Sequence, residues 1–149
     1  MGLDMYLTGR MYVGEWVNPQ AQEVVKGIFP QIPWKINNVS FEAGYWRKAN
    51  QIHKWFVDNV QDGVDECKEH EVSREQMEQL LSVCKRVIAD PKLGEELLPA
   101  ASGFFFGPTE YDEFYLGNIE DTISILEEIL SPENEEKYRF VDFYYQSSW

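Results

Sequence analysis

Segments typical of β-strands lie at the two ends of this chain, and patterns typical of α-helices lie between them. Near the start, "LDMYL" and "MYVGEWV" flank the turn-like tripeptide "TGR", which predicts a hairpin over residues 3–17. The prolines and glycine of residues 18–38 predict an irregular loop with one helical turn at "AQEVVKG". "NVSFEAGY" alternates apolar and polar residues and predicts a further strand. The aromatic C-terminal segment predicts a closing strand over residues 138–146, which we expect to pair with an N-terminal strand.

The middle of the chain carries three patterns that predict helices. Apolar residues recur at helical spacing over residues 45–60. "VSREQMEQLLSVCKRVIADP" adds a capping-box pattern, Ser73 with Gln76, and a stop at Pro91. "NIEDTISILEEILSPE" combines an inward apolar stripe with outward acids. This order predicts an α+β fold with one domain over residues 1–149, in which about three helices cover an antiparallel sheet built from the N-terminal strands and a C-terminal strand.

The charge of the chain is strongly negative and unevenly placed. The net charge is −13, and residues 61–149 hold 21 acidic against 7 basic side chains. Such a surface repels phosphate backbones, so we expect no direct binding of nucleic acid. It favours a partner protein with a basic surface, although acidity also serves solubility alone.

Several common classes of protein are disfavoured by what the sequence lacks. It has no apolar run long enough for a membrane span, and "MGLDMYLTGR" does not resemble a secretory signal, so we expect a cytoplasmic protein. Cys67 and Cys84 show no metal-ligand spacing with His53 or His70, which predicts reduced structural thiols and no metal site. The common motifs for nucleotide binding, serine hydrolysis and calcium binding do not occur, so we expect no cofactor.

The stretch "YWRKANQIHKWF" concentrates residues that could bind a ligand or a partner. On a helix, Trp46, Asn50 and His53 would share one ridge, with Arg47 on the neighbouring ridge and Lys48 beside it. An Arg fork binds carboxylate or phosphate, and a His exchanges protons near neutral pH. The alternative is a buried polar network that braces the helix against the sheet.

A second candidate cluster lies in "GFFFGPTEYDEFY". The polar residues of this cluster are Glu110, Tyr111, Asp112 and Tyr115, at the expected start of a helix. The helix dipole alone can explain the acids. The functional hypothesis places them across a cleft from Arg47 or Lys48. The three phenylalanines are expected to pack in the interior.

The last predicted helix supplies a third candidate, an acidic docking face. This face comprises Glu120, Asp121, Glu127 and Glu128, which lie outward at helical spacing. Carboxylates on a rigid helix can imitate DNA phosphates and occupy a basic groove. An ordinary solvated face is the alternative.

Four stretches, "MGLDMYL", "GYWRKANQIHKWFVDNVQDGVDEC", "SGFFFGPTEYDEFY" and "FYYQSSW", together resemble a family of small acidic proteins encoded by bacteriophages and prophages. The resemblance spans nearly the whole chain, and it implies a phage-type origin rather than a particular chemistry. It favours a protein that acts on a host machine.

The hypothesis is therefore a non-enzymatic interaction protein in the bacterial cytoplasm, which binds and inhibits a host protein as an anti-CRISPR or other anti-defence inhibitor. One alternative is a binder of a small anionic ligand such as a signalling nucleotide. Another is a small hydrolase-like enzyme that uses His53 with Glu110 or Asp112. The high content of aromatic residues is also compatible with a homodimer.

Overall fold

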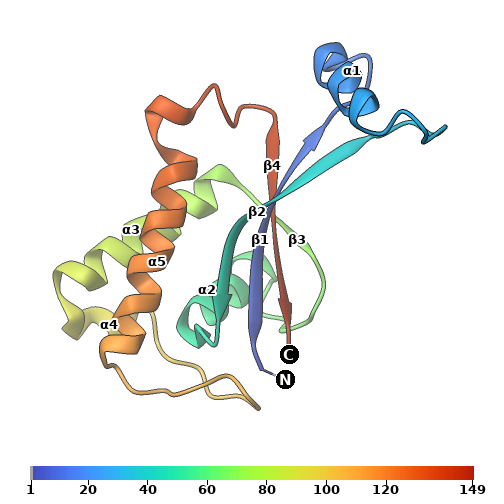
Figure 1. Ribbon diagram of the computed structural model, residues 1–149. Helices are drawn as coiled ribbons and strands as arrows, with labels where there is room; N and C mark the ends of the chain where they lie inside the picture. The colour runs from blue at the N-terminus through green and yellow to red at the C-terminus, as the bar shows by residue number, and fades with distance from the viewer. Residues whose placement is uncertain (1) are drawn as a thin grey trace.

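The computed structural model describes residues 2–149 and has an α+β fold (Figure 1). Within these residues an antiparallel sheet of four strands has the order β2-β1-β4-β3. The strands are β1 (Asp4–Tyr12), β2 (Asn38–Arg47), β3 (His70–Val72) and β4 (Val141–Ser148). β4 pairs directly with β1, so the predicted fold class and the pairing of the closing strand with an N-terminal strand are confirmed.

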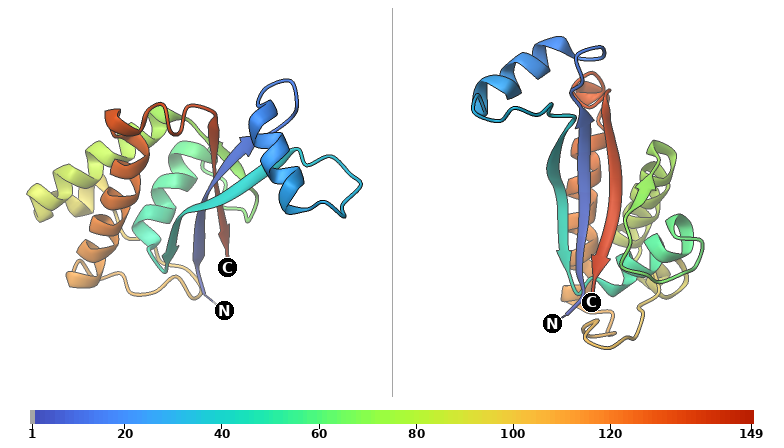
Figure 2. Two further views of the ribbon diagram at one scale, coloured as in Figure 1. Left: turned by 45° about the horizontal axis from the view of Figure 1, so that its top comes forward. Right: turned by 90° about the vertical axis from the view of Figure 1, so that its right-hand side faces the viewer.

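A layer of helices covers one face of the sheet, and the opposite face is open in both views of Figure 2. The helices of this layer are α2 (Asn50–Val60), α3 (Arg74–Ala89), α4 (Gly94–Leu97) and α5 (Glu113–Leu130), with 3-10 turns at Pro91–Leu93 and Pro132–Asn134. A further helix, α1 (Pro19–Ile28), stands apart from the layer, at the end of the long β1–β2 extension (Figure 1).

The core lies between the sheet and the helical layer. Alternate residues of β1 point inward, so Met5 and Leu7 are fully buried, as is Leu3 just before the strand. The ring of Phe56 from α2 stacks on the ring of Tyr145 from β4, with centroids 3.9 Å apart. The apolar stripes of α3 and α5 complete the core with Leu80, Cys84, Ile119 and Leu126.

Local signals define where the longer helices begin. Ser73 accepts a hydrogen bond from the Gln76 backbone N–H, and the Gln76 side chain accepts one from the Ser73 N–H, so the predicted capping box is confirmed. α5 begins at Glu113, earlier than its apolar stripe suggests, because Asp112 caps it by accepting a hydrogen bond from the backbone N–H of Tyr115.

The predicted hairpin over residues 3–17 is wrong, because β1 continues as one strand through "TGR". Gly9 faces inward, where a Cβ would lie 3.0 Å from Cγ1 of Val141 and 3.4 Å from the ring of Phe143. Glycine therefore serves the close approach of β4 rather than a turn. The closing strand also begins later than predicted, at Val141.

The predicted helix over residues 45–60 begins too early. Tyr45 and Arg47 are exposed while Trp46 is buried, which is the period of a strand, and β2 includes all three. Lys48 then adopts a positive φ of 56°, which ends the strand and turns the chain into α2. The predicted interior packing of the phenylalanines holds for Phe106 alone, because Phe104 and Phe105 are exposed.

Candidate functional site

Asn50 lies in the first turn of α2 and is 2% exposed. Its Nδ2 donates to the backbone oxygens of Phe106 at 3.2 Å and Pro108 at 2.9 Å. Its Oδ1 accepts a hydrogen bond from the backbone N–H of Ala101 at 3.0 Å. Asn50 therefore fastens the loop before α5 to α2, and both ends of its amide are used within the protein.

His53, one turn further along α2, is 1% exposed and lies between two partners. Its Nδ1 is 2.7 Å from the hydroxyl of Tyr145, and its Nε2 is 3.0 Å from Oδ1 of Asp65. Because an ionised carboxylate only accepts, the neutral ring carries its proton on Nε2 and accepts the Tyr145 hydroxyl hydrogen at Nδ1. The indole N–H of Trp149 also donates to Asp65, so this network holds the last residue of the chain.

Burial determines the protonation of this network. It lowers the pKa of His53 below the usual value of 6.5, and the opposing effect of the Asp65 carboxylate is smaller. Burial also raises the pKa of Tyr145 well above its ordinary value. A neutral His and a neutral Tyr in the interior brace α2 against β4, and this geometry supports a structural role for both.

The structure separates the residues predicted to gather around "YWRKANQIHKWF". Trp46 is buried and donates from Nε1 to the hydroxyl of Thr122 at 2.8 Å. The side chain of Arg47 is 60% exposed, with Nε 4.0 Å from a carboxylate oxygen of Asp4. Lys48 occupies the turn, and its backbone N–H donates to the carbonyl oxygen of Leu3. Arg47 and Lys48 thus lie outside the Asn50–His53 network.

A small pocket of about 240 Å³ borders His53. Its charged lining consists of Lys54, Asp58 and Asp65, and Lys54 already pairs with Asp58 at 2.6 Å. Two carboxylates and one paired ammonium do not favour an anion. The geometry here gives no support to a site for a signalling nucleotide.

The second predicted cluster also has structural partners. The Tyr111 hydroxyl accepts a hydrogen bond from the backbone N–H of Ala100, and Asp112 caps α5. Tyr115 is buried and donates to the carbonyl oxygen of Leu98, and burial raises its pKa. Glu110 is exposed. Across the described chain, residues 2–149, these acids form no hydrogen bond or ion pair with His53.

The four residues of the acidic docking face are all exposed on α5, as the helical period predicts. Glu127 pairs with Lys85 at 2.8 Å, and Glu128 pairs with Lys137 at 2.8 Å. Glu120 and Asp121 have no cationic partner within 4.0 Å among residues 2–149. These two carboxylates are therefore the ones available to another molecule.

α5, which carries these carboxylates, is anchored to the rest of the protein. The inward side of the helix is buried through Ile119, Leu126 and Ile129. Thr122 accepts the Trp46 indole N–H and donates its own hydroxyl hydrogen to the carbonyl oxygen of Asn118, which ties the middle of α5 to β2. The outward acids are thus displayed by a helix that is packed and hydrogen-bonded to the sheet.

A feature that the sequence did not suggest is an arm, residues 13–37, which carries α1 (Figure 1). At its neck the backbone N–H of Val13 donates to the carbonyl oxygen of Asn37 at 2.8 Å. Gln22, buried, donates its amide hydrogens to the carbonyl oxygens of Val13 and Ile36 at 2.7 and 2.9 Å, because carbonyl oxygens can only accept. The helical turn predicted at "AQEVVKG" lies within α1, and the helix is longer than predicted because Asn18 caps it and Pro19 occupies its first position.

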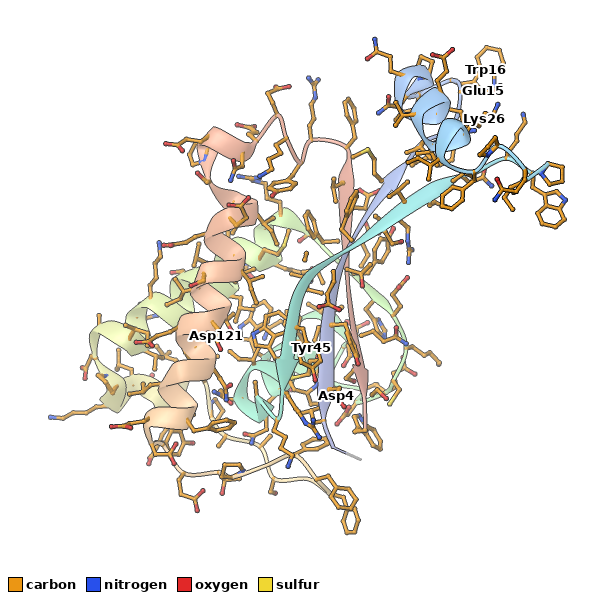
Figure 3. The ribbon with its side chains drawn as sticks, viewed as in Figure 1. Asp4, Glu15, Trp16, Lys26, Tyr45 and Asp121 are labelled. Carbon is orange, nitrogen blue, oxygen red and sulfur yellow. The ribbon has the colours of Figure 1, made fainter. Side chains whose placement is uncertain are left out.

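The arm places large apolar side chains in solvent. Trp16 is 95% exposed and Trp34 is 75% exposed. Further exposed apolar residues of the arm are Val17, Val24, Ile28, Phe29 and Ile32. Residues 13–37 hold two acidic and two basic side chains, so the arm is neutral and the rest of the chain carries the whole charge of −13. Figure 3 shows Glu15, Trp16 and Lys26 on the arm, far from Asp121 on α5.

An apolar cleft of about 480 Å³ lies at the base of the arm, between the inner face of the sheet and α5. Its apolar lining includes Met11, Phe41, Ile125, Ile129, Tyr138 and Phe143. Its charged lining consists of Glu42 and the ion pair of Glu128 with Lys137. The cleft and the arm are therefore adjacent apolar surfaces.

The fold and these surfaces describe a small α+β protein with an acidic body and a neutral apolar arm. No known protein family matches the chain, and no curated protein or solved structure proved similar to it. Among residues 2–149 no cluster of three or more His, Cys, Asp or Glu side chains could hold a metal ion. Over the same residues, none of the helices has the length and apolar character that a membrane crossing requires.

Proposed function

We propose that this chain is a non-enzymatic binding protein of phage type, which docks its acidic body onto a basic surface of a host protein and blocks it. The observation that carries the proposal is the array of outward carboxylates on α5, a helix fastened to the sheet through the Trp46–Thr122 hydrogen bond. Glu120 and Asp121 lie in the middle of this array, without ion pairs to other described residues.

The spacing of the acids on α5 supports docking in a groove built for nucleic acid. Glu113, Glu120 and Glu127 follow one another at intervals of seven residues, as do Asp121 and Glu128. Seven residues make almost two turns and rise about 10.5 Å, so each row stays on one side of the helix. Phosphates along one DNA strand rise about 3.4 Å each, so each interval corresponds to about three phosphates.

The net charge supports rapid and selective docking. Fixed charges outside a buried contact act mainly on the association rate, and salt screens them over about 8 Å at physiological ionic strength. A body of charge −13 is attracted to basic proteins and repelled by nucleic acid. A defence nuclease has the required basic groove, so an anti-CRISPR or other anti-defence inhibitor is the specific form of the proposal.

Differential capture from a bacterial lysate tests the proposal. The test variant is Glu120→Lys with Asp121→Lys. The matched control is Glu71→Lys with Asp142→Lys. These two substitutions replace exposed acids on β3 and β4 and change the net charge by the same amount as the test variant. We expect that the wild type and the control both capture one host protein, and that the test variant does not capture it.

Two results would contradict the proposal. One is capture of the same proteins by all three forms, or by none. The other is release of a bound nucleotide when the purified protein is denatured, which would favour the small-anion alternative.

A further inference from the structure

We infer that the arm is a docking element for a second copy of this chain, and that in a two-fold dimer each arm covers the apolar cleft of the other copy. The inference goes beyond the proposed function, because it concerns another surface and another partner. It explains why one chain has both an uncovered apolar arm and an open apolar cleft next to it.

The arm is ordered without a core of its own. α1 has ten residues, and its buried residue, Gln22, is polar and serves the neck. A helix this short is marginal in water unless its apolar side packs on something. The ion pair of Lys26 with Glu15 at 2.9 Å and the Asn18 cap add local support. Because this local support is small, we expect the apolar side of the arm, with Trp16 and Trp34, to pack on a partner.

The placement of charge allows the arm of a second copy to occupy the cleft. Two bodies of charge −13 repel each other, but the neutral arm can approach a body without that cost. Lys26 and Lys35 line a hollow of about 310 Å³ in the arm, beside Trp34. Glu42 lines the cleft, where Lys137 is already paired with Glu128. Neither Lys35 nor Glu42 has an ion-pair partner in the described part of the chain, so the two surfaces complement each other.

The topology leaves the cleft accessible from the side of β2. β2 is an edge strand of the sheet, and it continues from the cleft residue Phe41 into the arm. A two-fold axis that places one arm over the other cleft also produces the reciprocal contact, so the assembly closes as a dimer and does not grow into a fibre.

The area available is sufficient for a specific interface. Each large aromatic side chain buries about 150–250 Å², so the four indoles of two arms contribute roughly 600–1,000 Å². The aliphatic residues of α1 and the cleft lining add to this. A stable interface buries about 1,200–2,000 Å² in total. A two-fold dimer can therefore bury the area of a stable interface, because each arm and each cleft contributes in both copies.

The first measurement is the molar mass in solution by sedimentation equilibrium over micromolar concentrations. We expect the wild type to be a dimer. The variant Trp16→Ala with Trp34→Ala should raise the dimer dissociation constant by at least about 100-fold, because buried Trp residues dominate interfaces. The matched control is Phe104→Ala, an aromatic residue that is 84% exposed on the body, and it should leave the dimer intact.

The second measurement separates arm-to-cleft contact from arm-to-arm contact. Ala43→Phe adds a ring to the cleft lining, and Glu42→Lys reverses an exposed charge there without touching the core. Each should weaken the dimer. Mixing the Trp variant, which keeps its cleft, with Ala43→Phe, which keeps its arm, should form a heterodimer through the one intact arm–cleft contact.

A wild type that is monomeric at all these concentrations would overturn the inference. So would a Glu42→Lys variant and an Ala43→Phe variant that both dimerise like the wild type while the Trp variant does not, because that result assigns the contact to arm against arm. Circular dichroism verifies that each variant is folded. The outcome is independent of capture by the acidic face, so failure of one proposal leaves the other standing.

Discussion

The buried His53 network offers a quantitative test of the role of α2. His53→Ala removes the ring between Tyr145 and Asp65. The Tyr145 hydroxyl, fully buried, then lacks its partner, at a cost of about 1–3 kcal/mol. The lost hydrogen bond to Asp65 and the cavity left by the ring add to that. We expect the free energy of unfolding to fall by about 3–5 kcal/mol in total.

A double-mutant cycle in urea denaturation isolates the contact between the two rings. Tyr145→Phe removes the hydroxyl that His53→Ala leaves without a partner. The double variant should therefore lose less stability than the sum of the single variants, by about 1–2 kcal/mol. Arg47→Ala is the matched control from the same stretch of sequence. Its side chain is exposed, so we expect a change within about 0.5 kcal/mol.

The pH dependence of stability follows from the same residue. The unfolded chain protonates His53 near its usual pKa of 6.5, whereas burial lowers the pKa of His53 in the folded protein. The unfolded state therefore binds more protons as the pH falls below about 6.5, and stability declines until the folded-state pKa is passed. His53→Gln should remove this part of the decline.

Two results would refute the structural reading of His53. One is a loss below about 1 kcal/mol for His53→Ala. The other is an identical pH profile for the wild type and His53→Gln between neutral and mildly acidic pH. Either would mean that the ring is not held in the interior as a neutral brace, and a ligand-binding or catalytic role would regain support.

Three further variants test the core, the thiols and the neck of the arm. Phe56→Ala removes the ring stacked on Tyr145 and should cost about 3–5 kcal/mol in chemical denaturation. Burial raises the pKa of Cys84 to about 12, so a thiol reagent should label the exposed Cys67 quickly and native Cys84 only on unfolding. Gln22→Ala removes the two hydrogen bonds that its side chain makes at the neck, so limited proteolysis should cut the arm faster while the melting of the body stays unchanged.

Local signals in the sequence were sufficient for α3 and for the outward acids of α5. The capping box at Ser73 and the apolar period act within a few residues of each other, so neighbouring residues alone define that helix. The same period places Glu120 and Asp121 outward, whatever they bind. Their role in docking stays a prediction.

Contacts between distant residues explain what the sequence could not show. Gly9 looks like a turn residue in the sequence, but glycine is needed there because the side chain of Val141, more than a hundred positions away, packs against it. Trp46 fits a helix as well as a strand, and the pairing of β2 with β1 decides between them. Beyond one helical turn, the arm escaped prediction because the buried residue of α1 is the polar Gln22, whose partners are the carbonyl groups of Val13 and Ile36 on either side of the helix. Apolar periodicity carries no information about such contacts.

The association kinetics of the captured host protein test the central claim, docking through the acidic face, most directly. For the wild type and the Glu71→Lys/Asp142→Lys control, we expect an association rate constant that falls steeply as salt is added. Glu120→Lys/Asp121→Lys should lower that rate constant at low salt and flatten its salt dependence, with a smaller change in the dissociation rate. Association that neither salt nor the α5 variant alters would contradict the claim that the carboxylates of α5 dock this protein onto a basic surface.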